Sequence, residues 1–331
     1  MTVAVIGLGS MGKRRIRLMK AMRLSINVIG VDSKYDRCEA AKKQFNIESY
    51  ASLEEAEKHT KIRCVFICTS PLAHADIIHL CLLHGYHVFT EINLVSDRYS
   101  ENILLAREKK LTLFLSSTPI YREEMKQITK VVKGNGNAVS YLYHVGQYLP
   151  DWHPWEKYDQ FFVGDQRTNG CREIFAIELP WMVKAFGDIE SVHVQTGRMT
   201  KLDISYQDTY MVQITHINGN LGVFAVDVTC RKPIRKLEVY NEGLYMEWEG
   251  TPQTLKKYDF HAREMKTVEC GEYYNEPEYC EFVNECAYIN EINEFFKVIN
   301  GKQPEYTMEK DAEILKIIDK IEGIDKETKL S

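Results

Sequence analysis

A glycine-rich turn near the start of the chain has the residue types and spacing needed to hold a pyrophosphate. It follows a short apolar run and precedes an amphipathic segment. In such a G-x-G-x-x-G turn Gly7 permits a sharp bend, Gly9 admits a phosphate to the main chain, and Gly12 lets the next helix pack closely on the strand. Ser10 and Met11 would begin that helix, where unpaired N–H groups favour anions.

A carboxylate after the second apolar run would read the ribose of the same ligand. Asp32 ends the run Ile26–Val31, twenty residues beyond Gly12, which is where an acidic side chain reaches a ribose 2′-OH. Ser33, the next residue, is predicted to contact the same dinucleotide. Because Asp32 repels a 2′-phosphate, NAD is expected rather than NADP, although Lys34 weakens that preference. The alternative is an ordinary glycine turn and a surface aspartate.

Oxidation of an alcohol also needs a base for the hydroxyl proton, and Glu178 is the first candidate. It lies in an otherwise apolar segment, where desolvation would raise the pKa of its carboxyl towards a useful value. Pro180 would kink or begin a helix there. The alternative is a structural glutamate paired with Arg172 or a neighbouring lysine, and the sequence leaves both interpretations open.

A polar and aromatic stretch, residues 143–156, offers a second set of candidates. It holds two tryptophans, two histidines and two acids, and aromatic faces suit sugar rings. His153 is the alternative acid–base group, because an unperturbed histidine titrates near neutrality. A packed surface loop or a contact with a neighbouring subunit would explain the same composition. The predicted substrate residues are Tyr148, Trp152, Trp155, Arg172 and Glu173.

The length, composition and net charge of the chain argue against several classes of partner. A length of 331 residues predicts two domains, and a net charge of −5 gives no reason to expect a nucleic-acid or membrane-surface partner. No apolar run reaches the length of about eighteen residues that a membrane span needs. The first strand begins at residue 2 or 3, without room for a signal peptide, so a cytoplasmic location is expected. Nine scattered cysteines without zinc-ligand spacing predict reduced thiols and no metal.

The order of elements predicts an α/β fold. Up to residue 120, apolar strands such as 62–68 and 87–90 alternate with helical segments such as 73–83, which indicates a doubly wound parallel sheet, a Rossmann domain. Residues 121–331 predict an α+β domain with a largely antiparallel sheet, hairpins at 218–220 and 241–243, and two closing helices. Its strands 210–217 and 221–228 are apolar on both sides, which predicts a homodimer or homotetramer formed through this sheet.

Four segments in a fixed order carry a family resemblance. They are Gly7–Gly12, Cys68–His74, Val88–Leu94, and Tyr288–Phe296 with Asn300–Pro304 after it. Over nearly the whole chain they resemble the Gfo/Idh/MocA family of NAD(P)-dependent, mostly sugar-directed oxidoreductases. The resemblance implies that Thr69, Ser70, Pro71 and His74 belong to the cofactor site. It also implies that Glu91 lies beside the nicotinamide ribose, and the competing interpretation of Glu91 is a surface glutamate at a strand end.

The chain departs from the family where the family's catalysis resides. Ile92 and Asn93 stand where the family has the Lys and Pro of Glu-Lys-Pro, and Ile174 and Glu178 stand where it has Asp and His. The expected function is an NAD(P)-dependent oxidoreductase that transfers hydride at a carbinol or carbonyl of a sugar or sugar derivative. Two alternatives stay open: a dinucleotide-binding sensor or partner subunit without turnover, and an NAD-retaining enzyme with net non-redox chemistry. The basic run Lys13–Arg15 is interpreted as a solvated helical turn rather than a phosphate contact.

Overall fold

The computed structural model describes residues 1–152, 156–276 and 282–324. The chain forms two compact units. The first comprises Met1–Ser117 together with Tyr288–Glu313, and the second comprises Thr118–Ala287 together with the residues from Ile314 onward. The predicted boundary at residue 120 lies three residues from the observed one, but the segment 288–313 belongs to the first unit rather than the second.

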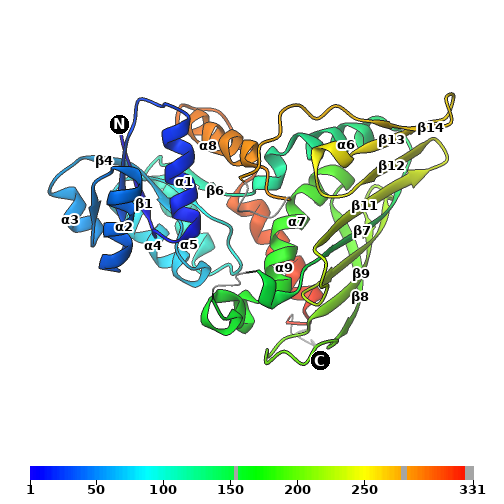
Figure 1. The fold of residues 1–331 in the computed structure, drawn as a ribbon, viewed down its shortest axis with the longest axis horizontal. Coiled ribbons are helices and arrows are strands. Elements are labelled where there is room, and N and C mark those ends of the chain that lie inside the picture. Colours follow the sequence, from blue (N-terminus) through cyan, green and yellow to red (C-terminus); the bar gives the residue numbers. More distant parts are fainter. Residues whose placement is uncertain (153–155, 277–281, 325–331) are drawn as a thin grey trace. The chain divides into compact units, whose positions relative to one another are not determined.

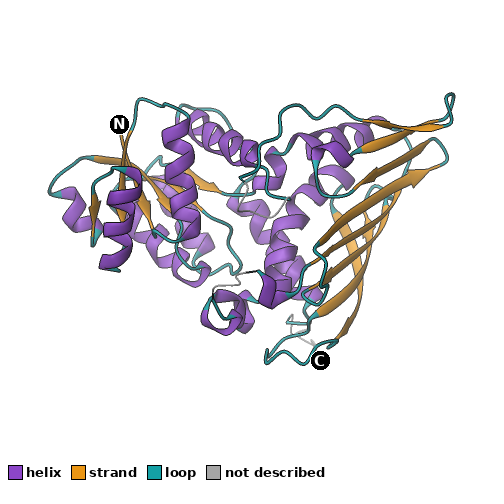
Figure 2. Ribbon diagram, viewed as in Figure 1, coloured by secondary structure: helices purple, strands orange, loops and turns teal. Residues whose placement is uncertain are grey.

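The first unit is built on a six-stranded parallel sheet in the order β3-β2-β1-β4-β5-β6 (Figures 1 and 2). At its centre, Ala4 lies opposite Ile29 on one neighbouring strand and Val65 on the other. This order confirms the predicted Rossmann domain. The strands are β1 (Thr2–Ile6), β2 (Asn27–Val31), β3 (Ser49–Tyr50), β4 (Ile62–Ile67), β5 (His87–Thr90) and β6 (Leu113–Leu115).

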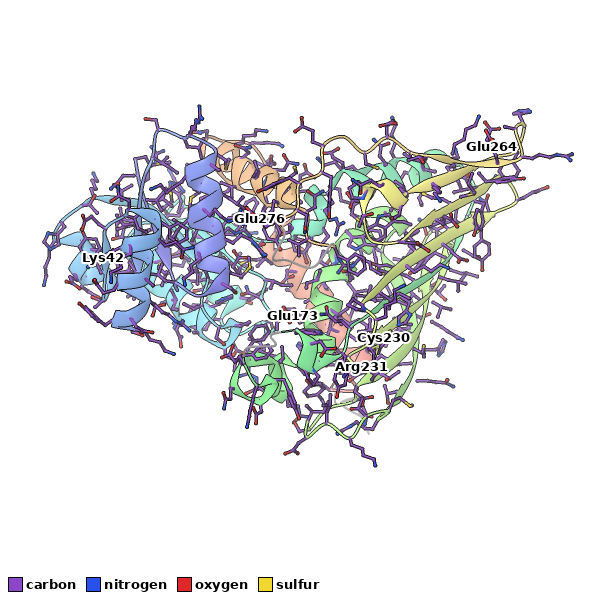
Figure 3. All side chains as sticks on the ribbon, in the orientation of Figure 1. Lys42, Glu173, Cys230, Arg231, Glu264 and Glu276 are labelled. Carbon is purple, nitrogen blue, oxygen red and sulfur yellow. The ribbon has the colours of Figure 1, made fainter. Side chains whose placement is uncertain are left out.

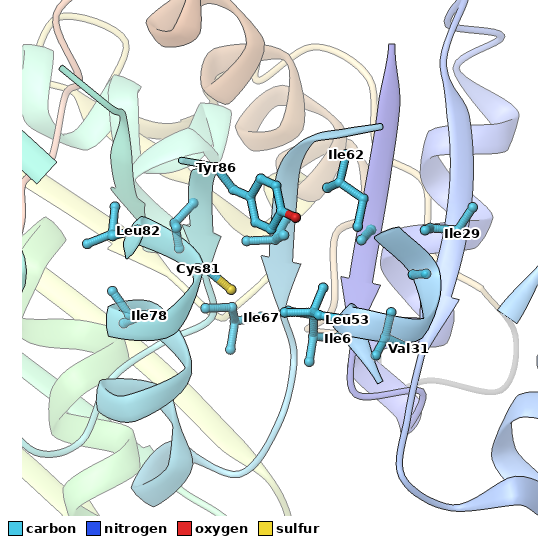
Figure 4. Packing of buried hydrophobic residues seen from close by; sticks show 14 of the residues in the cluster. Ile6, Ile29, Val31, Leu53, Ile62, Ile67, Ile78, Cys81, Leu82 and Tyr86 are labelled. Atoms are coloured by element: carbon cyan, nitrogen blue, oxygen red, sulfur yellow. The ribbon is translucent and has the colours of Figure 1, made fainter. Parts of the chain in front are cut away.

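Helices cover both faces of this sheet. On one face, Ile78 and Cys81 of α4 pack on Ile6 and Ile67 (Figure 4). On the other, the ring of Phe295 from α8 packs edge-on against a row of strand phenylalanines that includes Phe66, which explains why the closing segment joins the first unit. The helices are α1 (Ser10–Ala21), α2 (Tyr35–Phe45), α3 (Leu53–Glu57), α4 (Pro71–Leu83), α5 (Tyr99–Glu108) and α8 (Glu285–Ile299).

The second unit carries an eight-stranded sheet in the order β14-β13-β12-β11-β7-β10-β9-β8. Its described strand pairs are antiparallel except for β7 with β10. Both predicted hairpins form. Strands β13 and β14 form a further hairpin that extends the predicted sheet. The strands are β7 (Ser140–Gly146), β8 (Ile189–Gly197), β9 (Thr209–His216), β10 (Leu221–Asp227), β11 (Ile234–Asn241), β12 (Leu244–Trp248), β13 (Lys256–Asp259) and β14 (Glu264–Thr267).

Helix α7 (Gly170–Phe186) packs on one face of that sheet, next to α6 (Glu123–Gly134), and α9 (Met308–Ile321) closes the chain. The Asn169 side chain caps α7 by accepting a hydrogen bond from the Arg172 N–H at 2.8 Å. The helix therefore begins at Gly170 and continues through Pro180, so the prediction that Pro180 starts or kinks a helix is wrong about the start. Among the described helices, none is both long and apolar enough to cross a membrane.

Candidate cofactor and acid–base sites

The glycine turn joins β1 to α1 where the strand order of the first sheet reverses, the usual ligand position in such sheets. Gly7 has φ +90°, and a Cβ on it would lie 2.7 Å from the carbonyl oxygen of Cys68. A Cβ on Gly12 would lie 1.9 Å from the carbonyl oxygen of Gly7. Backbone conformation and close packing therefore require glycine at position 7, and close packing requires it at position 12, as predicted.

Gly9 differs from its neighbours because no packing within the unit requires it. A Cβ on Gly9 would meet only the Arg37 Nη1, at 3.9 Å. This open position lies at the start of α1, whose first N–H groups, those of Ser10 and Met11, have no partner within the helix. Space and donors thus fit the pyrophosphate of a dinucleotide, which supports the prediction that these residues bind NAD.

Asp32 is held in place from two sides at the end of β2. Its Oδ2 accepts a hydrogen bond from the Leu8 N–H at 2.8 Å, and its Oδ1 accepts one from the Lys34 N–H at 2.9 Å. The Arg37 guanidinium lies 3.6 Å from Oδ2. Asp32 is buried, whereas Ser33 beside it is exposed. The carboxylate is therefore fixed next to the glycine turn, where a ribose-binding acid is expected.

The Thr69–Pro71 turn at the end of β4 is fixed by His74. One ring nitrogen of this buried histidine lies 3.0 Å from the Thr69 carbonyl oxygen and the other 2.7 Å from Asn93 Oδ1. Burial lowers the pKa of His74. Pro71 begins α4 and Ser70 is exposed, while the Thr69 hydroxyl is buried without a described partner. The turn thus offers Thr69 and Ser70 to a ligand, and His74 holds the turn.

Glu91 is engaged by Arg15 in the interior of the first unit. Arg15 donates to its two oxygens at 2.6 and 3.0 Å and to Glu291 of α8 at 2.7 Å. Arg15 is fully buried and Arg14 nearly so, so the prediction of a solvated Lys13–Arg15 turn is wrong for both arginines. The surface interpretation of Glu91 is also wrong, because the carboxylate is buried. Its contacts favour a role in fixing the end of β5.

Glu178 occupies a fully bonded position inside the second unit. Its Oε2 accepts hydrogen bonds from the Tyr143 hydroxyl at 2.7 Å and the Trp181 indole at 2.6 Å, and its Oε1 accepts one from Arg235 at 2.6 Å. Three donors, one of them a guanidinium, thus satisfy both oxygens of this buried carboxylate. The geometry favours the structural alternative, with Arg235 as the partner instead of Arg172 or a lysine.

The Arg172 side chain is likewise bound by partners within its own unit. It is buried and forms ion pairs with Asp319, at 2.7 Å, and with Glu322 at the end of α9. Asn169 donates to the same Glu322 at 2.7 Å. These contacts tie the first turn of α7 to the end of α9, so Arg172 positions that turn, and the contacts do not favour its prediction as a substrate ligand.

Glu173, the next residue, has no described hydrogen bond or ion pair within residues 1–152, 156–276 and 282–324. It is half-buried on the first turn of α7 (Figure 3). Burial raises the pKa of its carboxyl to about 7. Phe175 packs against the sheet through Tyr210 and Phe224, and at 100° per residue Glu173 lies on the opposite side of the helix. A carboxyl group that titrates near neutrality is thus presented away from the unit's own sheet.

The aromatic stretch before α7 is partly described. Arg231 lies over the Tyr148 ring, 4.1 Å from its centroid, and the Trp152 indole donates to the Gln147 carbonyl oxygen at 3.0 Å. Both aromatic residues are half-buried. His153 and Trp155 lie outside the described residues. Tyr148 and Trp152 therefore keep part of their rings accessible to a ligand, as the substrate prediction requires.

The first 116 residues match a family model described as an oxidoreductase family with an NAD-binding Rossmann fold. Residues 1–116 belong to the Gfo/Idh/MocA family. Over these residues the match confirms the resemblance drawn from the sequence, together with its NAD-binding Rossmann fold. No curated protein matches the chain.

Solved structures extend the likeness of fold over both units. A levoglucosan dehydrogenase in complex with NADH and L-sorbose has a TM-score of 0.81 at 15% identity, covering 97% of this chain and 95% of that one. The UDP-N-acetylglucosamine 3-dehydrogenase of Acidithiobacillus ferrooxidans gives 0.74 at 14%, covering 97% and 96%. A putative NADPH-dependent oxidoreductase from Desulfitobacterium hafniense gives 0.77 at 16%, covering 96% and 93%. At these identities the comparison establishes the fold.

Two residues at these sites escaped the sequence prediction. Arg37 lies on the first turn of α2, where side chains point back towards the N-terminus of the helix, here towards Asp32 and Gly9. A basic residue one helical turn beyond the ribose acid is a signal that could have found it. Arg235 offers no such signal, because its partner Glu178 is 57 residues away.

Proposed function

We propose that the chain is an NAD-dependent oxidoreductase that transfers hydride at a carbinol or carbonyl carbon of a sugar or sugar derivative. The observation that carries the proposal is the glycine turn, in which Gly9 leaves an open position at the start of α1 beside the fixed carboxylate of Asp32. Bound NAD supplies the hydride acceptor. The sugar class is supported by the names of the levoglucosan and UDP-N-acetylglucosamine dehydrogenases and by the aromatic rings of Tyr148 and Trp152.

Within this proposal Glu173 holds and releases the proton of the substrate hydroxyl. A base for this step must be free of other partners and must titrate near the working pH. Glu173 meets both conditions among the described residues, because its carboxyl has no described partner and a pKa of about 7. Glu178 keeps Tyr143 and Arg235 in place, and Arg172 holds the helical turn that presents Glu173.

The test is a screen of NAD⁺ with a panel of free sugars, anhydrosugars and nucleotide sugars, followed by NADH absorbance. We expect one class to give steady NADH formation. Ile92, at the position of the family's usual lysine, is the observation that favours the alternative of a dinucleotide-binding protein without turnover. That alternative predicts NADH binding by calorimetry but no NADH formation with any sugar. Interconversion of a sugar without net NADH would indicate the non-redox alternative.

We also propose that the protein is a homo-oligomer joined through the outer face of the second sheet. Leu142, Met211 and Leu221 on this face are 45%, 47% and 52% exposed. Leu142 lies opposite Val223 in the β7–β10 register, and Met211 lies opposite Ala225 in the β9–β10 register, so three neighbouring strands present apolar side chains on this face. A second copy of the same sheet would remove it from water, and two-fold symmetry is the default.

Light scattering is therefore expected to give at least a dimer mass at micromolar protein concentration. Leu142→Glu should shift the protein towards the monomer, because it buries a charge at the centre of the surface. Leu104→Glu, at an exposed leucine of α5 in the other unit, is the matched control and should leave the mass unchanged. A monomer mass for the unmodified protein would contradict the proposal.

A cytoplasmic location is part of the same proposal. The described cysteines are all free thiols, which is the state that a reducing compartment maintains.

A further inference from the structure

Three segments of the second unit meet beside the first turn of α7. The Tyr148 N–H donates to the Cys230 carbonyl oxygen at 2.7 Å, which joins the segment after β7 to the loop after β10. A Cβ on Gly170 would lie 3.4 Å from Cη2 of the Trp152 ring, so the start of α7 packs against the same segment. Glu173 lies three residues beyond Gly170, on a neighbouring part of the helix surface. The two aromatic residues and Glu173 therefore border the same part of this unit.

Arg231, in the loop after β10, adds a positive charge to this region (Figure 3). Its guanidinium group lies over the Tyr148 ring, 4.1 Å from the ring centroid. The side chain is 70% exposed, and its described ion pair with Asp151 spans 3.9 Å, which is longer than a hydrogen bond. Stacking on Tyr148 thus fixes the plane of the guanidinium group while its charge stays accessible.

The loop that carries Arg231 is anchored without using the Arg231 side chain. Asp227, at the end of β10, accepts hydrogen bonds at its Oδ1 from the Thr229 and Cys230 N–H groups, at 2.8 and 2.7 Å. Its Oδ2 lies 2.7 Å from His144 Nε2. The contacts of Asp227 are thus made with other residues, and they hold the loop in place before a ligand binds.

The donors of the Arg231 guanidinium group are available to an anion. None of its five N–H donors makes a hydrogen bond in the part of the chain that the structure describes. A guanidinium group that stacks through its face keeps these donors on its edge, where two of them match two oxygens of a carboxylate or a phosphate. Lys232, the next residue, is also exposed. An oxyanion therefore fits both the charge and the paired donors, whereas a neutral hydroxyl group uses only the donors.

We propose that Arg231 binds an oxyanion of the substrate, so that the enzyme prefers an anionic sugar, with a carboxylate or a phosphate, to the neutral sugar. This inference rests on the proposed oxidoreductase function and specifies the substrate class of the same site. Arg231 donates two parallel hydrogen bonds to the anionic group, beside the rings of Tyr148 and Trp152. At the hydroxyl group that is oxidised, the carbon gives a hydride to NAD⁺ and the oxygen gives a proton to Glu173.

The test compares sugars that differ in one group: glucose, glucuronate and glucose 6-phosphate, the matching galactose series, and UDP-glucose for a diphosphate. We measure kcat/KM with NAD⁺, and by calorimetry the Kd of each sugar for the NADH-bound protein. At least one anionic sugar should exceed its neutral partner by about tenfold or more, and its identity distinguishes carboxylate, phosphate and diphosphate. Arg231→Gln should lose about 10- to 100-fold on that sugar, as expected of hydrogen bonds to a charged group, and less than about threefold on the neutral one.

Two further variants separate the guanidinium group from charge in general. Arg231→Lys keeps the charge but loses the planar pair of donors, so it should recover only part of the preference. Arg263→Gln removes an exposed charge from the turn between β13 and β14 of the same unit and should leave the preference unchanged.

The kinetic and binding results test the substrate class and the proposed function separately. A neutral sugar that is oxidised as well as every anionic one, or an equal loss on both in Arg231→Gln, would overturn the anionic class and leave the oxidoreductase function intact. If no sugar yields NADH, the proposed function falls and the Kd values decide. Anionic sugars that bind more weakly to Arg231→Gln then support the site, whereas anionic sugars that do not bind, or bind equally to both proteins, overturn it.

Discussion

Glu173→Gln should lower kcat/KM by at least about 100-fold once the substrate is known, with the Kd of NADH unchanged. General acid–base groups typically contribute two to four powers of ten, and glutamine keeps the shape of the side chain while removing its proton exchange. Glu173 combines the absence of a described partner with burial that raises the pKa of its carboxyl to about 7. Steady-state kinetics and calorimetry on the same preparation would measure both quantities.

The pH profile gives the sign of this effect. Oxidation of an alcohol needs Glu173 deprotonated, so kcat/KM should fall as the pH drops below about 7. Reduction of the carbonyl needs Glu173 protonated, so its rate should fall as the pH rises above the same value. In Glu173→Gln both limbs should disappear. An unchanged profile in the variant would rule out this role.

Glu178→Gln is the matched comparison on the same helix. It weakens a buried ion pair with Arg235 and keeps the size of the side chain. We expect its unfolding midpoint to fall more than that of Glu173→Gln, because Arg235 loses its charge partner. If Glu178→Gln instead lost turnover at full stability, the acid–base role would pass to Glu178, as the sequence alone suggests.

Arg15→Met should lower the free energy of unfolding of the first unit by about 3–5 kcal/mol, as measured by chemical denaturation. The change leaves the carboxylates of Glu91 and Glu291 buried without their cation, and uncompensated buried charges are costly at this scale. The control is Arg107→Met, which breaks an exposed ion pair with Glu309 on the same unit and should cost less than about 1 kcal/mol.

The loss in Arg15→Met should also depend on pH. Burial raises the pKa of Glu291, and Arg15 opposes that rise, so removal of Arg15 raises the folded-state pKa further above the unfolded value. Between those two values the folded state binds more protons, so stability falls as the pH rises through the window. The deficit relative to the unmodified protein should therefore be smaller near about pH 5 than near about pH 8. A small loss that does not vary with pH would contradict the electrostatic account.

The sequence by itself determined the parallel sheet of the first unit and its cofactor turn, but not that the segment 288–313 joins this unit. Strand periodicity, the three glycines and the acid at Asp32 all act over short distances along the chain. Gly7 and Gly12 are needed because of backbone φ and of a helix that packs on the strand just before it, and such local requirements leave a readable pattern. The hairpins of the second sheet were predictable for the same reason, since their turns lie at Asn-Gly and Glu-Gly steps.

Only the tertiary structure decided which charged groups are structural and which remain available. Arg15 looks like a solvated helical residue until Glu91 and Glu291, 76 and 276 residues away, are placed against it. In the sequence Glu178 looks like an unpaired acid in an apolar segment, whereas in the structure it forms an ion pair with Arg235 of β11. Glu173 and Arg231 are noticed because they keep a carboxyl and a guanidinium group without a described hydrogen bond. The physical reason is that the ionisation and availability of a side chain depend on burial and on partners that no local pattern of residues specifies.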